Sequence, residues 1–184
     1  MNLVAKATIL DSAEMARILR RMAGEIVESH GGVDGLMIVG IRTRGVPMAE
    51  TVCDEIEKLE GSRPSMGTLD ITLYRDDLSL VAPKPVVRES RFPEDLDGKT
   101  LVLCDDVLFT GRTVRAALDA LVDFGRPEAV RLAVLVDRGW RELPIHADFV
   151  GRKVPTSATE VIKVSFESTD GASKVEILDK PARA

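Results

Sequence analysis

The chain has 184 residues, of which 45% are hydrophobic and 30% are charged, and its formal net charge is −5. This composition is typical of a soluble globular protein, and the length predicts a single domain over residues 1–184. There is no overall basic excess to announce nucleic-acid binding, and the low aromatic content of 4% argues against an RNA reader built on stacked rings. No signal peptide or membrane-spanning run stands out in the sequence, so we expect a cytoplasmic protein without membrane contact.

The first half of the chain alternates helical and strand patterns. Helical spacing of apolar residues predicts a helix over 11–30, with Asp11 and Glu14 as a capping box and Gly31 as its stop. The wholly apolar run Leu36–Ile41 predicts a strand covered on both faces. Pro47 then suits the first turn of a second helix, whose predicted buried stripe is Ala49, Val52, Cys53, Ile56 and Leu59.

The second half repeats this alternation after an irregular segment. Residues 66–74 are predicted to form a strand, and the segment 76–93 has no clear period, which is typical of a lid or a disordered stretch. Strands are predicted over 101–105 and 130–136, and a helix between them should bury Val114, Ala117, Leu118, Leu121 and Val122. Shorter strands are expected at 149–150, 161–166 and 175–178, and the tail 179–184 is expected to fray.

Alternating strands and helices predict a mostly parallel central sheet with helices on both faces. Three polar loops follow predicted strands, at 42–45, 105–113 and 137–139. Because parallel strands end at the same edge of a sheet, where ligands bind in such folds, we expect these loops to converge on one site. Cys53 and Cys104 each lie in an apolar stretch and are interpreted as core thiols.

The loop after the third predicted strand carries the strongest chemical signal. Asp105 and Asp106 suit ribose hydroxyls or a hydrated cation, although an acidic pair alone is more often a solvated loop or a phosphate-receiver pocket. The following Thr110-Gly111-Arg112-Thr113 favours a sugar-phosphate site, because the glycine permits close backbone approach and a helix N-terminus attracts phosphate.

This stretch resembles the 5-phosphoribosyl-1-pyrophosphate (PRPP) signature of type I phosphoribosyltransferases. The resemblance implies that Asp105 and Asp106 face the ribose. It also implies a 5′-phosphate loop made of Val107, Leu108, Phe109, Thr110, Gly111, Arg112 and Thr113. The loop with Thr43, Arg44 and Gly45 is similar to the pyrophosphate loop of the same family, although by itself it is a basic turn at a helix start.

The segment 70–78, Asp-Ile-Thr-Leu-Tyr-Arg-Asp-Asp-Leu, narrows the family further. It resembles the entrance to the active-site lid in the PyrR family of pyrimidine operon regulators, which are also uracil phosphoribosyltransferases. The motifs Leu-Val-Asp-Arg-Gly at 135–139 and Arg-Glu-Leu-Pro at 141–144 match the same family, and the resemblance extends from about residue 9 to 166. It implies a type I phosphoribosyltransferase fold with a flexible lid over about 75–93 and a small hood.

The resemblance also implies a reaction in which uracil and PRPP give UMP and pyrophosphate. In this interpretation Asp105, Asp106, Arg44 and Arg75 are catalytic, with Arg75 reaching pyrophosphate from the lid. Arg138 and the backbone near Ile162 would line the uracil site. Mg²⁺ would be bound mainly through PRPP, near the two aspartates and with no dedicated protein ligands. The family further suggests a homodimer or a larger homo-oligomer.

Regulation through UMP-dependent binding to pyrimidine-operon messenger RNA is the second function that the family implies. A basic face for RNA could consist of Arg17, Arg20, Arg21, Arg141, Arg152 and Lys153, although acidic residues lie nearby in sequence. Trp140 and His146 depart from the His and the basic residue that RNA-binding relatives tend to carry at these positions. A salvage enzyme without RNA regulation, or a phosphoribosyltransferase for another base, therefore stays open.

Overall fold

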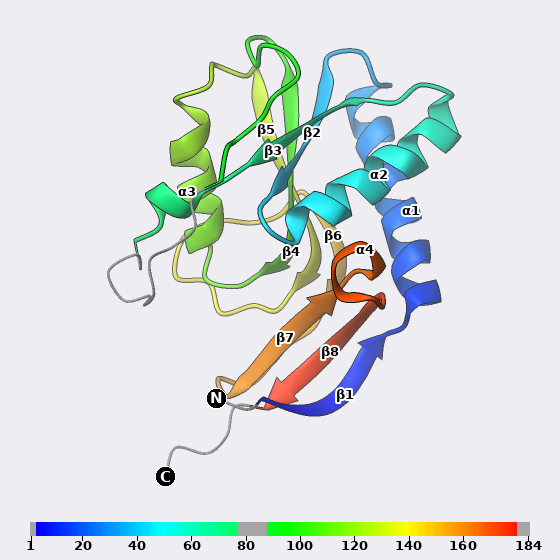
Figure 1. The fold of residues 1–184 in the computed structure, drawn as a ribbon, viewed down its shortest axis with the longest axis vertical. Helices are drawn as coiled ribbons and strands as arrows, with labels where there is room; N and C mark the ends of the chain where they lie inside the picture. Colours follow the sequence, from blue (N-terminus) through cyan, green and yellow to red (C-terminus); the bar gives the residue numbers. More distant parts are fainter. Residues whose placement is uncertain (1–2, 77–87, 180–184) are drawn as a thin grey trace.

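A five-stranded parallel sheet forms the centre of the protein in a computed structural model that describes residues 3–76 and 88–179 (Figure 1). The strand order is β3-β2-β4-β5-β6, and all four neighbouring pairs are parallel. The strands are β2 (Leu36–Ile41), β3 (Ser65–Leu69), β4 (Thr100–Leu108), β5 (Ala129–Asp137) and β6 (Phe149–Lys153). This arrangement confirms the predicted parallel sheet.

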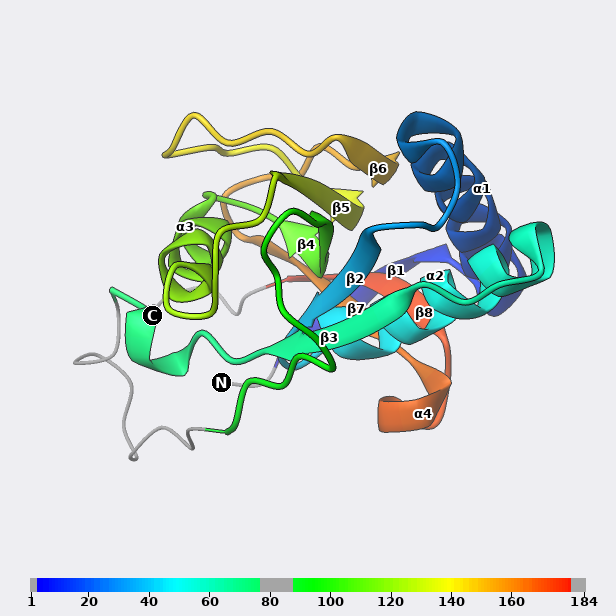
Figure 2. The ribbon, with the colours of Figure 1, turned by 90° about the horizontal axis from the view of Figure 1, so that it is seen from above.

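Helices cover both faces of the sheet. Helices α1 (Ser12–His30) and α2 (Gly45–Glu60) lie on one face, and α3 (Arg112–Leu121) lies on the other (Figure 2). Each face has its own apolar core, because the central strands bury alternate side chains on opposite sides. The core under α1 and α2 contains Ile38 and Val102, and the core under α3 contains Val39 and Leu103.

A smaller antiparallel sheet, which we call the hood, lies beyond one end of the central sheet (Figure 1). It consists of β1 (Val4–Leu10), β8 (Lys174–Asp179) and β7 (Glu160–Ser165), in that order, together with the short helix α4 (Glu167–Asp170). Val164, Phe166 and Val175 of the hood belong to the same apolar core as α1 and α2. The hood is thereby packed onto the central sheet through side chains that exclude water.

Local sequence signals place several element ends as predicted. Asp11 caps α1 in a capping box with Glu14, and Gly31 ends the helix in a left-handed conformation. Strand β2 spans the predicted run. Both cysteines are buried, as expected for core thiols.

Other expectations were wrong. The predicted strand over 66–74 ends at Leu69 and is followed by the 3₁₀ helix η1 (Thr72–Tyr74). Strand β1 was not foreseen, because its residues are mostly exposed and lack an apolar pattern. Three side chains predicted to be buried are instead exposed, by 51% for Leu59, 41% for Leu118 and 77% for Val122, since each lies at the margin of its helix's apolar stripe.

The predicted lid falls largely outside the description. Residues 77–87, which make up most of the predicted lid, are among those that the structure does not describe. The flanking described residues do pair: Thr68 and Arg91 form an isolated antiparallel bridge.

The three polar loops converge as expected, because β2, β4 and β5 are adjacent parallel strands. A close backbone approach fixes the first loop against β4. A Cβ atom on Gly45 would collide with the carbonyl oxygen of Cys104, so only glycine fits at the start of α2.

The substitution Gly45→Ala is expected to displace this loop and to reduce the free energy of unfolding by about 1–3 kcal/mol, the usual cost of overpacking. Gly24 is a matched control, because it lies inside α1 and a Cβ there would meet no atom within 4 Å. Gly24→Ala should instead stabilise the protein by about 0.5–1 kcal/mol. Denaturant unfolding of both variants tests this, and equal effects would contradict it.

Candidate active site

Two adjacent carboxyl groups mark the centre of the candidate site. Asp105 and Asp106 lie within the last residues of strand β4 rather than in a loop after it. The pairing of β4 with β5 continues as far as Leu108. Asp105 is buried, and its Oδ1 accepts a hydrogen bond of 3.1 Å from the N–H of Asp106. Asp106 Oδ1 in turn accepts a bond of 3.0 Å from the N–H of Val107. These bonds orient both carboxyls from their own strand.

Burial makes both carboxyls hard to ionise. It raises the pKa of Asp105 well above its usual range, and the neighbouring charge of Asp106 raises it further. Burial also raises the pKa of Asp106, while the positive charge of Arg44 opposes that rise. Such a pair gains most from a partner with positive charge or hydroxyl donors, which are the properties of a cation and a ribose.

The loop after β4 presents its carbonyl groups to the loop after β5. Arg141 donates from Nη1 to the carbonyl oxygen of Phe109 (2.7 Å) and to that of Leu108 (3.4 Å). The N–H groups of Glu142 and Leu143 both donate to the carbonyl oxygen of Thr110. With these carbonyls engaged on one side, the loop's own N–H groups are available to an anion on the other side.

Helix α3 begins directly after this loop. Its N-cap is Gly111, whose φ of 95° is left-handed, and no side chain caps the helix. The Arg112 N–H donates to Thr110 Oγ1 at 3.3 Å, so the N–H groups that follow it in the first turn of α3 are the ones available to a phosphate. The Arg112 side chain is engaged elsewhere, because it forms ion pairs with Asp76 (2.6 Å) and Glu142 (2.9 Å). Thr113 is half-buried at the same helix start.

The loop between β2 and α2 adds buried donors to the site. A cis peptide bond joins Arg42 to Thr43. Among the described residues, the Nε atoms of Arg42 and Arg44 are buried without a hydrogen-bond partner, as is that of Arg115 on α3. A buried donor without an acceptor costs about 1–3 kcal/mol, which an anionic ligand at this loop would offset. Arg44 Nη2 donates to Asp170 of the hood at 3.1 Å.

Arg138 follows β5 and connects the phosphate loop to the hood. Its guanidinium lies 4.0 Å from the centre of the Phe109 ring, a cation–π contact. Nε donates to Thr156 Oγ1 at 3.0 Å and Nη2 to the carbonyl oxygen of Glu160 at 3.0 Å. The residue is buried, and burial lowers the pKa of its guanidinium. Ile162, the other predicted uracil residue, is on β7 with its side chain buried in the core under α1 and α2.

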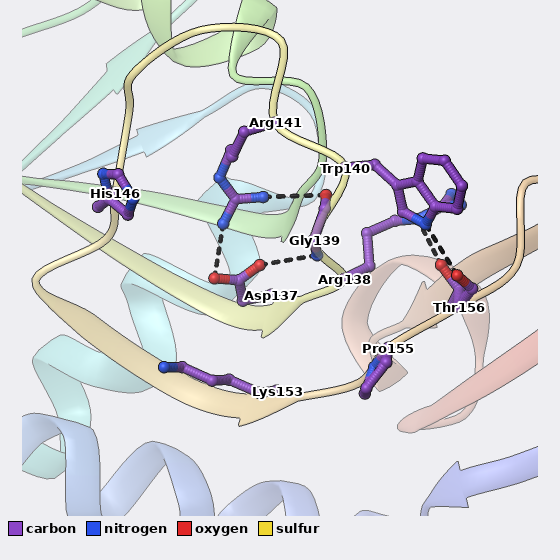
Figure 3. A pocket seen from close by; sticks show the side chains of 9 residues that line it. All are labelled: Asp137, Arg138, Gly139, Trp140, Arg141, His146, Lys153, Pro155 and Thr156. Carbon is purple, nitrogen blue, oxygen red and sulfur yellow. Dashed lines mark hydrogen bonds and ion pairs between the residues drawn. The ribbon is translucent and has the colours of Figure 1, made fainter.

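A cavity of about 610 Å³ lies beside Arg138 (Figure 3). Trp140 lines it and is 53% exposed, with its indole Nε1 donating to the carbonyl oxygen of Thr156 at 2.8 Å. His146 and Lys153 line the cavity as well. Asp137 forms an ion pair of 2.6 Å with Arg141. Burial opposes ionisation of Asp137, but bonds from Arg141 and the Gly139 N–H outweigh it and lower its pKa.

The residues predicted to contact RNA do not form one unpaired basic face. Arg20 bonds to Glu55, Arg21 to Glu25 and the carbonyls of Val150 and Gly151, and Arg152 to the Ile9 carbonyl and Glu14. Arg141 is used inside the phosphate loop. Arg17 and Lys153 are exposed. The structure thus brings Arg21 and Arg152 together at the contact of α1 and β6, and places Lys153 at the cavity.

Arg75 is exposed at the end of η1, next to Asp76 and its ion pair with Arg112. Within 3–76 and 88–179 no three His, Cys, Asp or Glu side chains gather as a metal site. No helix in the same residues is both long enough and apolar enough to cross a membrane.

The family model described as "Phosphoribosyl transferase domain" matches residues 6–169. "Bifunctional protein PyrR" of Deinococcus radiodurans is 56% identical over 174 residues, covering 95% of both chains. That of Thermus aquaticus is 57% identical over 175 residues, covering 95% of this chain and 97% of its own.

The chain belongs to the PyrR family of phosphoribosyltransferases. Solved structures of more distant proteins share its fold. A hypoxanthine phosphoribosyltransferase of Staphylococcus aureus has a TM-score of 0.71 at 17% identity, covering 98% of both chains. That of Trypanosoma cruzi has a TM-score of 0.71 at 14% identity, covering 95% of this chain and 97% of its own. This likeness confirms the predicted fold class of the chain, the type I phosphoribosyltransferase fold.

The sequence did not reveal three contacts of the candidate site. These are the ion pair of Arg44 with Asp170 and the contacts of Arg138 with the Phe109 ring and with Thr156. Asp170 is 126 positions from Arg44, and an acidic residue in a short C-terminal helix carries no local signal of such a contact. The Asp-Gly pair at 170–171 indicates only a turn, which the structure uses as the end of α4.

The raised pKa of Asp105 predicts a pH-dependent effect of Asp105→Asn on stability. Unfolded aspartates ionise near pH 4, whereas the folded carboxyl retains its proton to higher pH, so the wild-type protein loses stability as pH rises from about 4 through the folded pKa. The variant lacks this loss. Its free energy of unfolding relative to the wild type should therefore increase from about pH 4 to pH 8.

The matched control is Asp119→Asn, since Asp119 is exposed on α3, where it pairs with Arg115. Chemical unfolding across this pH range measures the difference. A stability difference between Asp105→Asn and the wild type that does not change with pH would rule out the buried charge as its cause.

Proposed function

We propose that the chain transfers phosphoribose from PRPP to uracil, giving UMP and pyrophosphate, and that it also regulates pyrimidine gene expression by binding messenger RNA. The observation that carries the enzymatic part is the convergence of three elements on one sheet edge. These are the carboxyl pair of buried Asp105 and half-buried Asp106, the start of α3, and the donor-rich loop at Arg42–Gly45. Membership of the bifunctional PyrR family supports both parts.

Each part of PRPP would meet a group of suitable charge. The 5′-phosphate would lie on the N–H groups of the loop 108–113 and of α3. The ribose hydroxyls would face Asp105 and Asp106, which also oppose the positive charge that develops on the ribose ring. Arg44 and Arg42 would receive the departing pyrophosphate. This reaction depends on positioning and charge rather than on a protein nucleophile.

Magnesium is expected to enter with PRPP, because the two buried carboxyls suit a cation and Mg²⁺ commonly keeps few protein ligands. When bound it would neutralise part of the charge of the leaving pyrophosphate. The chain's own share is to orient the ribose through Asp105 and Asp106 and to hold the pyrophosphate through Arg44.

The uracil assignment predicts a base preference. Pyrophosphate should be released from PRPP with uracil and not with hypoxanthine, guanine or adenine. Asp105→Asn and Arg44→Ala should each lower turnover by about 100-fold or more, since they remove charge stabilisation at the reacting centre. Arg126→Ala, an exposed arginine away from the site, is the control. Equal rates with a purine base would overturn the assignment.

Arg138 is proposed to line the uracil site because it joins Phe109 of the phosphate loop to the hood. Arg138→Ala should raise KM for uracil by about tenfold or more and KM for PRPP much less, as expected for loss of a charged hydrogen bond to the base. Steady-state kinetics at saturating PRPP measures this, with thermal unfolding as the check on folding. A rise in KM for PRPP alone would contradict the role.

RNA regulation is supported by the cavity at Arg138 to Thr156. Exposed Trp140 is held by its bond to the Thr156 carbonyl and offers a flat surface for a base, and Lys153 offers a charge for a phosphate. Base stacking on an aromatic side chain is worth about 1–3 kcal/mol. The wider face over Arg17, Arg20, Arg21, Arg141 and Arg152 is less favoured, since most of these guanidiniums bond to protein acceptors.

RNA binding is tested with the pyrimidine-operon leader of the source organism, with and without UMP, over a range of salt concentrations. Lys153→Ala should weaken binding and reduce the slope of log affinity against log salt by about one. Lys163→Ala, an exposed lysine of the hood, should change neither. Absence of UMP-dependent affinity in the wild-type protein would leave a salvage enzyme. The expected homo-oligomer stays a prediction that light scattering can test.

A further inference from the structure

One ion pair joins the hood to the pyrophosphate loop across 126 positions of sequence. Arg44 Nη2 and Asp170 Oδ1 lie 3.1 Å apart. Arg44 is the residue before α2, and Asp170 is the last residue of α4. The pair is partly shielded, with side chains 38% and 23% exposed.

The Asp170 carboxylate is oriented by hydrogen bonds from neighbouring residues as well as by Arg44. Its Oδ2 accepts bonds from the Phe166 N–H at 3.1 Å and from Thr169 Oγ1 at 2.9 Å. Oδ1 is thereby directed to Arg44. The backbone bond from Phe166, followed by those from Thr169 and Arg44, keeps the pKa of Asp170 below its usual range, so the group is a fixed anion at neutral pH.

Within residues 3–76 and 88–179, the ion pair engages only part of the Arg44 guanidinium. A guanidinium has five N–H donors, and the bond to Asp170 uses Nη2 alone. The Nε atom is buried without a partner among the described residues. The positive charge of Arg44 also acts on Asp106 and lowers its pKa against the effect of burial. Arg44 thus lies between the acidic pair and the hood, and among the described residues its Nε has no hydrogen-bond acceptor.

We propose that Asp170 is a positioning residue for the reaction: it holds the Arg44 guanidinium in the orientation that receives the pyrophosphate of PRPP. The inference rests on the proposed phosphoribosyl transfer. It also connects two substrates, because α4 follows β7, the strand that carries the predicted uracil residue Ile162.

Calorimetric binding of PRPP with Mg²⁺ tests the proposal without requiring any base. Asp170→Asn should raise the dissociation constant about fivefold, because a preorganised charge partner is lost. The dissociation constant for UMP, which has no pyrophosphate, should stay unchanged. In an Arg44→Ala background, Asp170→Asn should have no further effect on PRPP, which separates positioning from a general loss of structure.

Two variants serve as controls. Asp179→Asn removes another hood carboxylate, near Lys6, and should leave PRPP binding unchanged. Asp170→Glu keeps the charge and should restore most of the affinity, and thermal unfolding checks that each variant is folded. Unchanged or tighter PRPP binding by Asp170→Asn, an equal loss of UMP affinity, or an equal loss in the Arg44→Ala background would overturn the inference.

The experiment separates this inference from the proposed function. If the wild-type protein binds PRPP but releases no pyrophosphate with uracil, the acceptor assignment fails and the role of Asp170 stands. If the wild-type protein does not bind PRPP, both fail together.

Discussion

The candidate site depends on two carboxyl groups held inside the end of a buried strand. Asp105 and Asp106 continue the β4 ladder beside β5, so their positions are set by backbone hydrogen bonds of the central sheet. Their desolvation is a cost to the ligand-free fold, which the surrounding apolar core must offset. Function and stability are opposed at this point: the burial that destabilises the ionised pair strengthens its interaction with a cation or with a ribose that becomes positive.

The loop after β5 makes that arrangement rigid. Arg141 bonds to the carbonyls of Leu108 and Phe109 and to Asp137, so its guanidinium links the ends of two strands. Arg138 adds a second link, from Phe109 to Thr156 in the loop between β6 and β7. Two arginines of the Asp-Arg-Gly and Arg-Glu-Leu-Pro motifs thus shape the phosphate loop from behind. Arg141, which the sequence suggested as an RNA contact, is here a structural donor to the Leu108 and Phe109 carbonyls.

The sequence predicted most of the framework because the relevant signals are local. The capping box at Asp11, the apolar run of β2 and the glycine at the start of α3 each depend on neighbours within a few residues. The convergence of three loops followed from the rule for parallel sheets. Strand β1 was missed because it pairs with β8, at the far end of the chain, and has an exposed, unpatterned sequence.

Contacts between distant segments were the part that the sequence could not supply. No local pattern indicates that Asp170 pairs with Arg44, or that Arg141 turns inward while Lys153 stays exposed. The stripe of α3 was misread at Leu118 and Val122 for a related reason. Helical periodicity identifies an apolar face, but the width of that face that is covered depends on the strands and loops packed against it.

The contrast between a locally encoded framework and contacts between distant segments also bears on the likeness to hypoxanthine phosphoribosyltransferases. Hypoxanthine phosphoribosyltransferases share this architecture with TM-scores of 0.70 to 0.73 at 13–16% identity. What is shared at such low identity is the backbone frame of the fold. Under the proposed function, the base would be selected by side chains between β5 and β7, where Arg138 connects the phosphate loop to the hood. That segment also lines the cavity with Trp140 and Lys153, so under the proposed function UMP and RNA would contact adjoining parts of one loop.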